Sequence, residues 1–305
     1  MKRIFFSLML IIVINGGLIA QTKDSTLKAD TIKSDTIKPW RIKSNVVFTF
    51  GQSAYKYWAQ GGENSVSGIG NYKFTAFHKK NLTSWENTIE LAYGIVQQDS
   101  KKPYKTDDKI EITSNFGYKS RGYWFYSGLV DFRTQFTQGF KSIDDVVPIS
   151  NFMAPAYLIT SLGMEYKRKD FNLMLSAFTG KTTFVLDSAL SAAGAYGVVK
   201  GKKTKAGLGS YLRMTFKKQI MKNIEVNNKL ELYADYFDHP EEIVVNDEFV
   251  LKMKINKYFS TNINCNLIYD HNTKNSFKDA QGNILSNIAK TQLKEVFGLA
   301  INFVF

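Results

Sequence analysis

The chain has 305 residues, of which 44% are hydrophobic and 14% aromatic, and its 40 Lys and Arg against 27 Asp and Glu give a formal net charge of +13. This composition excludes a disordered protein, and the single cysteine, Cys265, excludes an intramolecular disulfide. Only one run, at the N-terminus, is apolar enough to enter a bilayer as a helix, which excludes a polytopic helical membrane protein.

The first twenty residues have the pattern of a secretory signal peptide. Lys2 and Arg3 precede an almost wholly apolar segment, 4–14, and Ala20 ends a second short apolar stretch. We expect cleavage after Ala20, which would place the protein outside the cytoplasm. An uncleaved helical anchor is the alternative, although the run is shorter than the ~20 residues that a helical span needs. No cysteine follows the run, so the pattern is not that of a bacterial lipoprotein.

Residues 21–39 form a polar tract in which the sequence DTIK occurs twice. The tract has too few apolar residues to offset the entropy of ordering it. We predict a flexible periplasmic leader over 21–39, followed by one domain over 40–305. A tether to peptidoglycan or to a partner is the alternative role of the leader.

From Trp40 onward, apolar and polar residues alternate with the period of two that is typical of β-strands. Val46, Phe48 and Phe50, for example, alternate with polar residues. Twelve such segments follow one another, at 42–50, 72–76, 85–95, 110–118, 124–132, 156–166, 171–179, 208–216, 226–234, 251–255, 263–269 and 297–305. With their flanks, most reach the roughly 9–11 residues that a tilted strand needs to cross a bilayer. A soluble β-sandwich, with strands of about five to six residues, is the alternative.

The connections between these segments are short and long in turn. The short ones are mostly basic and lie at 78–81, 119–122, 167–170, 217–223 and 256–258, and the longer ones lie at 53–64, 98–107, 137–154, 181–205, 238–242 and 271–290. Outer-membrane barrels have short periplasmic turns and longer external loops on an even number of strands. We therefore predict an all-β fold, a single antiparallel transmembrane β-barrel of about 12 strands, within a range of about 10–14.

Aromatic residues gather near the predicted periplasmic ends of the strands, where amphipathic rings favour the headgroup level. They are Trp40, Phe77, Trp85, Tyr118, Trp124, Tyr166, Phe171, Phe216, Phe259 and Phe303. The sequence then closes with an alternating strand whose terminal residue is Phe305. This ending resembles the signal that outer-membrane barrels present to their assembly machinery, which we expect as a partner.

Charged residues on the polar face of the strands would face the lumen by parity. They are Glu86, Glu90, Glu111, Asp131, Arg133, Lys229, Glu231, Asp235, Glu248, Lys252 and Lys254. Acids concentrate in the third to fifth strands, and bases in the tenth. In one interpretation the charges pair with one another and fill the lumen, which makes the barrel a solid scaffold. In the other they set up a transverse field across a water-filled path for a polar solute.

Several short motifs resemble an uncharacterised family of Gram-negative outer-membrane barrels, a domain of unknown function. They are the segments 58–65 (WAQGGENS), 107–111 (DDKIE), 115–118 (NFGY), 131–136 (DFRTQF) and 151–156 (NFMAPA), together with Phe305. The resemblance implies the barrel fold and the outer membrane, and it implies no catalytic activity. At 175–180 (LSAFTG) the chain departs from the pattern, because relatives are expected to have a proline after the serine.

The motif at 58–65 contains Trp58, Gly61, Gly62, Asn64 and Ser65. The glycines permit a tight turn, and Asn64 and Ser65 can bond to the backbone near the next strand. We expect either a folded first external loop or a loop that bends into the lumen and narrows it.

Residues with catalytic potential are few. The three histidines, His78, His239 and His271, have no metal-ligand spacing, and no phosphate-binding glycine loop or GxSxG motif is present. Asp238-His239 and Asp270-His271 both lie at predicted external strand ends, where such pairs could activate water. A rim hydrolase is therefore a third and less favoured functional hypothesis. The two favoured hypotheses, a channel and a closed scaffold, are not enzymes, and we expect no cofactor.

The sequence favours a narrow channel or transporter for a small polar or anionic solute in the outer membrane of a Gram-negative bacterium. The alternative is a closed barrel that acts as a structural, adhesion or assembly partner through its external loops. The excess of Lys and Arg is expected to meet anionic lipid headgroups, including lipopolysaccharide, rather than nucleic acid, for which no basic groove with interleaved aromatic residues is apparent.

Overall fold

The computed structural model describes residues 40–56, 63–99, 101–141, 145–278 and 284–305. The predicted signal peptide and leader, 1–39, and the motif residues Trp58, Gly61 and Gly62 lie outside the described residues. The strands are β1 (Trp40–Ser53), β2 (Ser65–Lys80), β3 (Thr83–Gln98), β4 (Tyr104–Lys119), β5 (Trp124–Thr134), β6 (Ala156–Lys167), β7 (Phe171–Phe184), β8 (Thr204–Met221), β9 (Ile224–Asp235), β10 (Val244–Lys254), β11 (Phe259–Tyr269), β12 (Lys274–Lys278), β13 (Ile284–Ala289) and β14 (Gln292–Val304).

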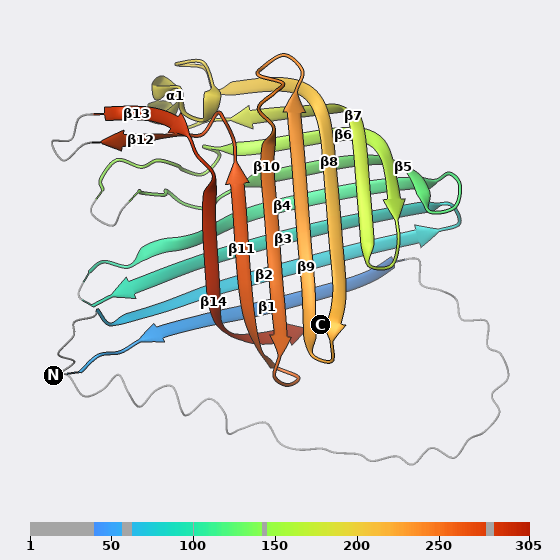
Figure 1. Ribbon diagram of the computed structural model, residues 1–305, viewed down its shortest axis with the longest axis horizontal. Coiled ribbons are helices and arrows are strands. Elements are labelled where there is room, and N and C mark those ends of the chain that lie inside the picture. Colours follow the sequence, from blue (N-terminus) through green and yellow to red (C-terminus); the bar gives the residue numbers. More distant parts are fainter. Residues whose placement is uncertain (1–39, 57–62, 100, 142–144, 279–283) are drawn as a thin grey trace, which may run out of the picture. The chain divides into compact units, whose positions relative to one another are not determined.

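Twelve of these strands form a closed antiparallel barrel. Their order around the ring is β1-β14-β11-β10-β9-β8-β7-β6-β5-β4-β3-β2, so nearly every strand pairs with its neighbours in sequence, and the last pairs with the first. Figure 1 shows β8 to β11 crossing in front of β1 to β4, as expected for two walls of a tilted, sheared barrel. The predicted fold class and strand number are confirmed.

The alternation of the sequence separates the two faces of the barrel wall. Outward side chains are large and apolar, and many are exposed, among them Phe48 (43%), Leu162 (69%) and Phe297 (67%). Inward side chains are mostly polar and buried, as Thr49 and Asp131 are. An apolar outer face around a polar interior is the arrangement of a transmembrane β-barrel. Within the described residues, no helix is both long and apolar enough to cross a membrane.

The two ends of the barrel differ in the length of their connections. At the short-turn end the connections are 81–82, 120–123, 168–170, 222–223 and 255–258, and at the long-loop end they are 54–64, 99–103, 135–155, 185–203, 236–243 and 270–291. Asn81, Gly122 and Asn223 have positive φ values of 50°, 61° and 119° in the short turns. Asn and Gly tolerate this conformation, so the sequence specifies the tight reversals.

An irregularity in β6 and β7 explains why the alternation around 171–179 is weak. The register shifts between Leu162 and Met164 in β6 and between Ser176 and Thr179 in β7. The Ser176 hydroxyl donates to the Leu162 carbonyl at 2.7 Å, so that Ser176 and Thr179 both face inward. A Cβ at Gly163 would lie 2.1 Å from the Leu175 carbonyl oxygen, so only glycine permits this close approach. This chain has Ala177 at the position after Ser176 where relatives are expected to have a proline, and β7 continues beyond it to its end at Phe184.

The last long connection contains a hairpin, β12 and β13, that the sequence analysis treats as loop. Its strands have only five and six residues, and their weak alternation gives no clear signal. The hairpin is a separate two-stranded sheet at the long-loop end (Figure 1).

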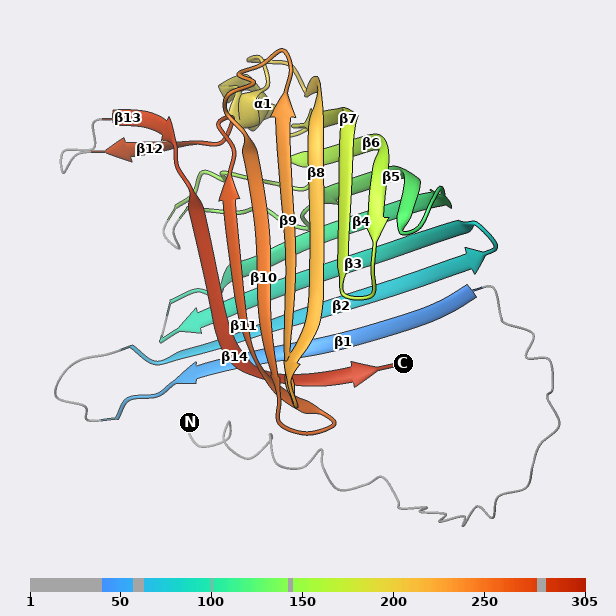
Figure 2. The same cartoon turned by 45° about the vertical axis from the view of Figure 1, so that its right-hand side comes forward.

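The seam that closes the barrel is short. β1 and β14 share six registered residue pairs, whereas β1 and β2 share fourteen. Figure 2 shows β14 turning near its C-terminal end to run along β1, where Phe305 exchanges two backbone hydrogen bonds with Ser44, at 2.9 and 3.0 Å. The terminal residue therefore lies at the seam on the short-turn side, with its side chain 77% exposed.

Candidate functional site

The inward charges of the barrel meet in one contiguous cluster, the lumen network. We define it as Lys73, Glu90, Lys109, Glu111, Asp131, Arg133, Arg213, Lys229, Glu231 and Glu248. Five carboxylates thus face five cations, so their formal charges cancel. The residues come from seven strands, β2, β3, β4, β5, β8, β9 and β10.

Arg133 of β5 contacts three acids of this network, as Lys109 of β4 does. Its guanidinium contacts Asp131 at 2.6 Å, Glu231 at 2.6 Å and Glu111 at 3.3 Å. Arg213 of β8 lies farther from two of the same acids, at 3.7 Å from Asp131 and 3.8 Å from Glu231. The planar guanidinium suits such multiple carboxylate contacts, because its N–H groups point in fixed directions.

Several ion pairs join walls on opposite sides of the ring. Lys109 of β4 contacts Glu248 of β10 at 3.3 Å, and five strands separate β4 from β10 in either direction around the ring. Lys229 of β9 contacts Glu111 of β4 at 2.9 Å and Glu248 at 3.2 Å. Side chains from facing walls are therefore in direct contact at this level of the barrel.

Neutral donors add hydrogen bonds to two of the buried acids of the network, Glu231 and Asp131. Glu231 accepts hydrogen bonds from the Tyr211 hydroxyl at 2.6 Å and from the Asn246 amide at 2.9 Å, and Asp131 accepts one from the Thr113 hydroxyl at 2.8 Å. The three most enclosed acids, Asp131, Glu111 and Glu231, are 0%, 2% and 4% exposed. Buried charges persist only where they are paired and hydrogen-bonded, as they are in this cluster.

An apolar cluster lies beside the network inside the barrel. It consists of Leu129, Ile159, Met174, Tyr211 and Tyr233, with Val244 packed against it. These side chains line β5 to β10, and Tyr211 belongs to both groups through its hydroxyl. Apolar as well as charged side chains therefore fill the interior. The sequence prediction considered only charged residues on the inward face and did not include this cluster.

The structure brings seven of the eleven predicted lumen residues into the network. Of the other four, Asp235 is buried near the long-loop end and accepts from the Tyr233 hydroxyl at 3.2 Å. Lys252 donates to the Asn302 side chain at 2.5 Å, whereas Lys254 and Glu86 are exposed near the short-turn end. Lys73, Lys109 and Arg213 also belong to the network but were not among the predicted lumen residues, although their strand parity places them on the inward face.

The acids and bases do not separate onto opposite walls. Lys109 and Arg133 lie on the wall where acids were expected to dominate, and Glu231 and Glu248 lie on the facing wall. Opposite charges are in contact, so they neutralise one another locally. A transverse field across an open path does not describe this arrangement.

Loops at the long-loop end pack into a structured cap with its own small apolar core. The loop cap is formed by 135–141, 145–155 and 185–203, and Ala154, Val185, Leu190 and Val198 are buried within it. Asp187 caps the helix α1 (Ser188–Ala193), and a 3-10 turn, η1 (Ala195–Gly197), follows. The hydrogen bond from the Asn151 side chain and those from the first backbone N–H groups of α1 lower the pKa of Asp187.

The described part of the motif at 58–65 ties two long connections together. The Asn64 side chain accepts from the Tyr55 backbone at 2.6 Å and donates to Asp99 at 2.8 Å. Ser65 shares a hydrogen bond with Ser53 across the ends of β1 and β2, at 2.8 Å. Asn64 and Ser65 therefore stabilise the base of the first long connection.

The Asp-His pairs predicted for a rim hydrolase lie at the long-loop end. His239 Nδ1 is 2.9 Å from Asp238, whereas Asp270 forms an ion pair with Lys181 at 3.1 Å. The partners recorded for the two imidazoles in the described residues are carboxylates and an amide, with no serine or cysteine among them. His239 therefore keeps its predicted Asp partner, whereas His271 lies 3.5 Å from Asp238 rather than paired with Asp270.

Comparison with known sequences identifies one family. Residues 50–140 match the family described as Protein of unknown function (DUF3078), which confirms the predicted resemblance over that part of the chain. The match includes the motifs at 58–65, 107–111, 115–118 and 131–136. No curated protein matches the sequence.

Solved structures with similar architecture are outer-membrane proteins of low sequence identity. An outer-membrane channel from Pseudomonas putida F1 is 10% identical with a TM-score of 0.41, over 90% of this chain and 100% of that chain. The translocator domain of the autotransporter NalP from Neisseria meningitidis is 9% identical with a TM-score of 0.36, over 89% and 90%. OmpT, an outer membrane protein of Vibrio cholerae, is 6% identical with a TM-score of 0.33, over 87% and 99%.

Proposed function

We propose that the protein is an outer-membrane barrel whose lumen is closed at rest by the lumen network and admits small polar or anionic solutes when that network rearranges. The apolar outer face and the difference between short turns and long loops support the membrane location. By the same analogy, the short-turn end faces the periplasm and the long-loop end faces the exterior.

The contact between Lys109 and Glu248 carries the proposal. These side chains reach from opposite walls to within 3.3 Å of each other, so a solute cannot pass between them unless the contact opens. Lys229 reinforces the closure because it contacts Glu248 and Glu111 together.

Multiple partners give the network a route to rearrangement. Glu111 contacts Lys109, Arg133 and Lys229, so the loss of one contact leaves a carboxylate that is still paired. A charged solute that enters the lumen can replace one of these partners without leaving a buried charge alone. A purely apolar filling would offer a polar solute no such exchange.

The charge of the long-loop end favours anions. Lys200, Lys202 and Lys203 are exposed in the loop cap, and they attract anions over about a Debye length, ~8 Å at physiological salt. The network itself is formally neutral, so selection by charge would take place at this mouth rather than at the closure. The proposed solute is accordingly small and polar, with a preference for negative charge.

A second function, a closed scaffold that binds partners through its external loops, is supported by the loop cap. Its buried apolar core and the hydrogen bond from the Tyr196 hydroxyl to the Ile149 carbonyl, at 2.7 Å, give these loops a defined surface. A barrel that never opens would need no mobile closure. Removing the lumen network would open the proposed channel but would not make a closed scaffold permeable to solute.

The termini complete the proposed pathway to the membrane. Residues 1–20 are a signal peptide, 21–39 are a periplasmic leader, and Phe305 engages the barrel assembly machinery. Basic residues near both rims contact anionic lipid headgroups, including lipopolysaccharide.

Solute efflux from proteoliposomes distinguishes the two functions. Vesicles loaded with a small anion are compared for the wild type, a network variant in which Lys109, Glu111, Lys229 and Glu248 are all replaced by alanine, and the control Lys217→Ala with Glu225→Ala. The control removes an equally neutral ion pair, at 3.3 Å, that lies outside the network. We expect efflux only with the network variant. Equal retention by all three proteins would contradict the gated channel and favour the scaffold.

A further inference from the structure

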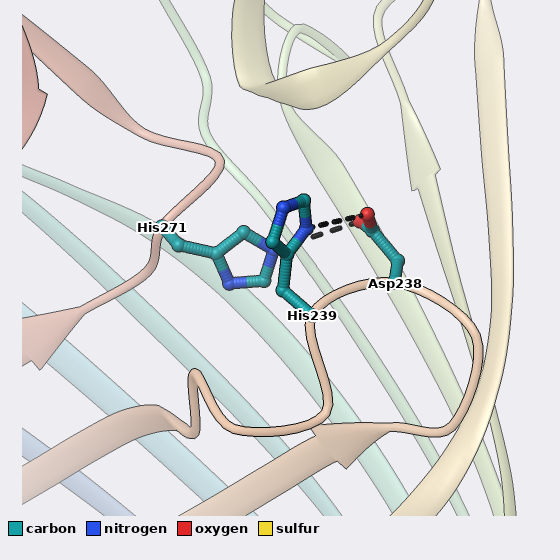
Figure 3. A group of neighbouring side chains, drawn as sticks. All are labelled: Asp238, His239 and His271. Carbon is teal, nitrogen blue, oxygen red and sulfur yellow. Dashed lines mark hydrogen bonds and ion pairs between the residues drawn. The ribbon is translucent and has the colours of Figure 1, made fainter.

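Three side chains able to bind a metal ion meet at the long-loop rim. Asp238 and His239 come from the connection 236–243, and His271 comes from the connection that follows β11. One donor atom from each of the three lies within 4.8 Å of the others, and the imidazole ring centroids are 5.5 Å apart. Figure 3 shows both imidazoles beside the Asp238 carboxylate. Residues 32 positions apart in sequence thus form one cluster.

His271 is the most enclosed of the three, and its hydrogen bonding is incomplete. The side chain is 10% exposed, and among the described residues its buried Nδ1 atom has no hydrogen-bond partner. Glu242 Oε2 lies 3.8 Å from that nitrogen, too far for a hydrogen bond. On the other side of the ring, Nε2 lies 3.0 Å from the Asn272 amide and 3.5 Å from Asp238 Oδ2, so Nε2 is the nitrogen that faces the cluster. An ion bound to Nε2 in place of the Asn272 contact would fix the proton on Nδ1, which could then donate to Glu242.

Asp238 supplies a carboxylate that contacts both a lysine and a histidine. Lys205 Nζ lies 2.5 Å from its Oδ2 atom, and His239 Nδ1 lies 2.9 Å from its Oδ1 atom. Lys205 also donates to Asn272 at 2.7 Å, so the lysine is held beside the cluster rather than within it. A carboxylate that bonds to a histidine is a common means of orienting a metal-binding imidazole.

We propose that Asp238, His239 and His271 bind one divalent transition-metal ion of the zinc class at the external rim. Two imidazole nitrogens with one carboxylate oxygen suit Zn²⁺, Cu²⁺ or Ni²⁺, whereas Ca²⁺ and Mg²⁺ prefer oxygen ligands alone. Glu242, whose Oε2 atom lies 3.8 Å from His271 Nδ1, would orient the bound imidazole from its far side rather than bind the ion. Tetrahedral zinc at bond lengths of about 2.0–2.1 Å separates its ligands by about 3.4 Å, so donors within 4.8 Å of one another must close by up to about 1.4 Å.

His239 has the freedom that this closure requires. Its side chain is 60% exposed and lies in a surface connection, so it can rotate towards His271 without disturbing the wall. The bound ion would join two long connections that no disulfide can join, because the chain has one cysteine. The ion would thus fix the external rim of β9 and β11, whether or not the lumen opens.

Metal titration of the full-length mature protein tests the site. The protein is purified without a histidine tag, titrated with ZnCl₂ by calorimetry, and separately loaded with Co²⁺, whose visible absorption reports nitrogen and oxygen coordination. His239→Ala and His271→Ala are compared with the control His78→Ala, which changes the remaining histidine at the end of β2. We expect one ion per chain in the wild type and the control, and at least tenfold weaker binding with altered Co²⁺ absorption in the other two.

Two outcomes would overturn the site. One is the absence of stoichiometric binding to the wild type, and the other is equal affinity among the wild type and all three variants. Because His271 is enclosed, its variant is checked for the heat-modifiable migration of a folded barrel. If it does not fold, Asp238→Asn takes its place, since the amide keeps the shape of the carboxylate and removes its charge.

Discussion

Replacing Arg133 by alanine removes the residue that links three acids of the lumen network. In the wild type its guanidinium contacts Asp131, Glu231 and Glu111 at 2.6, 2.6 and 3.3 Å. After the replacement, the ion pairs within 4 Å that Asp131 and Glu231 keep among the described residues are those with Arg213, at 3.7 and 3.8 Å. Five carboxylates then face four cations in a part of the lumen where those two acids are almost fully buried.

The expected cost follows from the burial of the remaining charges. Removing one partner of a buried ion pair typically costs about 3–5 kcal/mol, because it leaves an uncompensated charge. We therefore expect Arg133→Ala to lower the free energy of unfolding by about 3–5 kcal/mol. A larger loss is not expected, because both acids retain weak contacts to Arg213 and to neutral donors. The double variant with Glu231→Ala should lose less than the sum of the two single changes, with a coupling of about 1–3 kcal/mol.

Reversible urea unfolding in lipid vesicles, followed by tryptophan fluorescence, measures these free energies. The control is Arg121→Ala, in an exposed short turn, for which no ion pair is recorded in the part of the chain that the structure describes. Its effect should stay within about 0.5 kcal/mol. A loss for Arg133→Ala no larger than that of the control would refute the reasoning that the network is buried and paired.

Three further predictions concern the barrel wall and the loop cap. Gly163→Ala should destabilise the barrel by about 1–3 kcal/mol in the same unfolding assay, and Gly68→Ala, where an added Cβ meets nothing within 4 Å, should have little effect. The pKa of Asp187 is lowered in the folded cap, so its contribution to the stability of α1 is present above its ordinary pKa and is lost as the pH falls below about 4. Pepsin should then cleave the wild-type cap increasingly as the pH is lowered. In the variant Asp187→Asn, cleavage should depend less on pH. Cysteines at Phe48 and Ile301, which are registered partners, should form a disulfide across the seam in a background without the native cysteine, and failure to do so would argue against closure there.

Much of the barrel could be predicted because a membrane wall imposes its pattern on each strand. In β3, for example, Trp85, Tyr93 and Ile95 face outward while Glu90 and Ala92 face inward, so the period of two appears in the sequence itself. The short turns could be predicted for the same reason, since their positions depend on local residues. The bulge at Ser176 could not, because it depends on a hydroxyl bonding to the neighbouring strand.

The contacts within the lumen could be predicted only in part. Parity indicates that Glu111 and Lys229 both face inward, but the shear of the barrel decides that they meet at 2.9 Å across 118 residues of sequence. The same limit applies to the rim, where His239 and His271 have no ligand spacing along the chain and become neighbours only when β9 to β11 pair. A single sequence does not indicate which residues of two strands far apart in the ring lie at the same height in the barrel.

Unitary conductance in a planar lipid bilayer tests most directly whether the lumen network closes the barrel. The purified wild type and the variant in which Lys109, Glu111, Lys229 and Glu248 are replaced by alanine are measured in the same lipid and salt. We predict that the wild type is silent, or opens only rarely, and that the variant gives reproducible unitary steps. Steady, equal conductance in both proteins would contradict the account, because it would mean that solute passes without opening the contacts between Lys109, Lys229, Glu111 and Glu248.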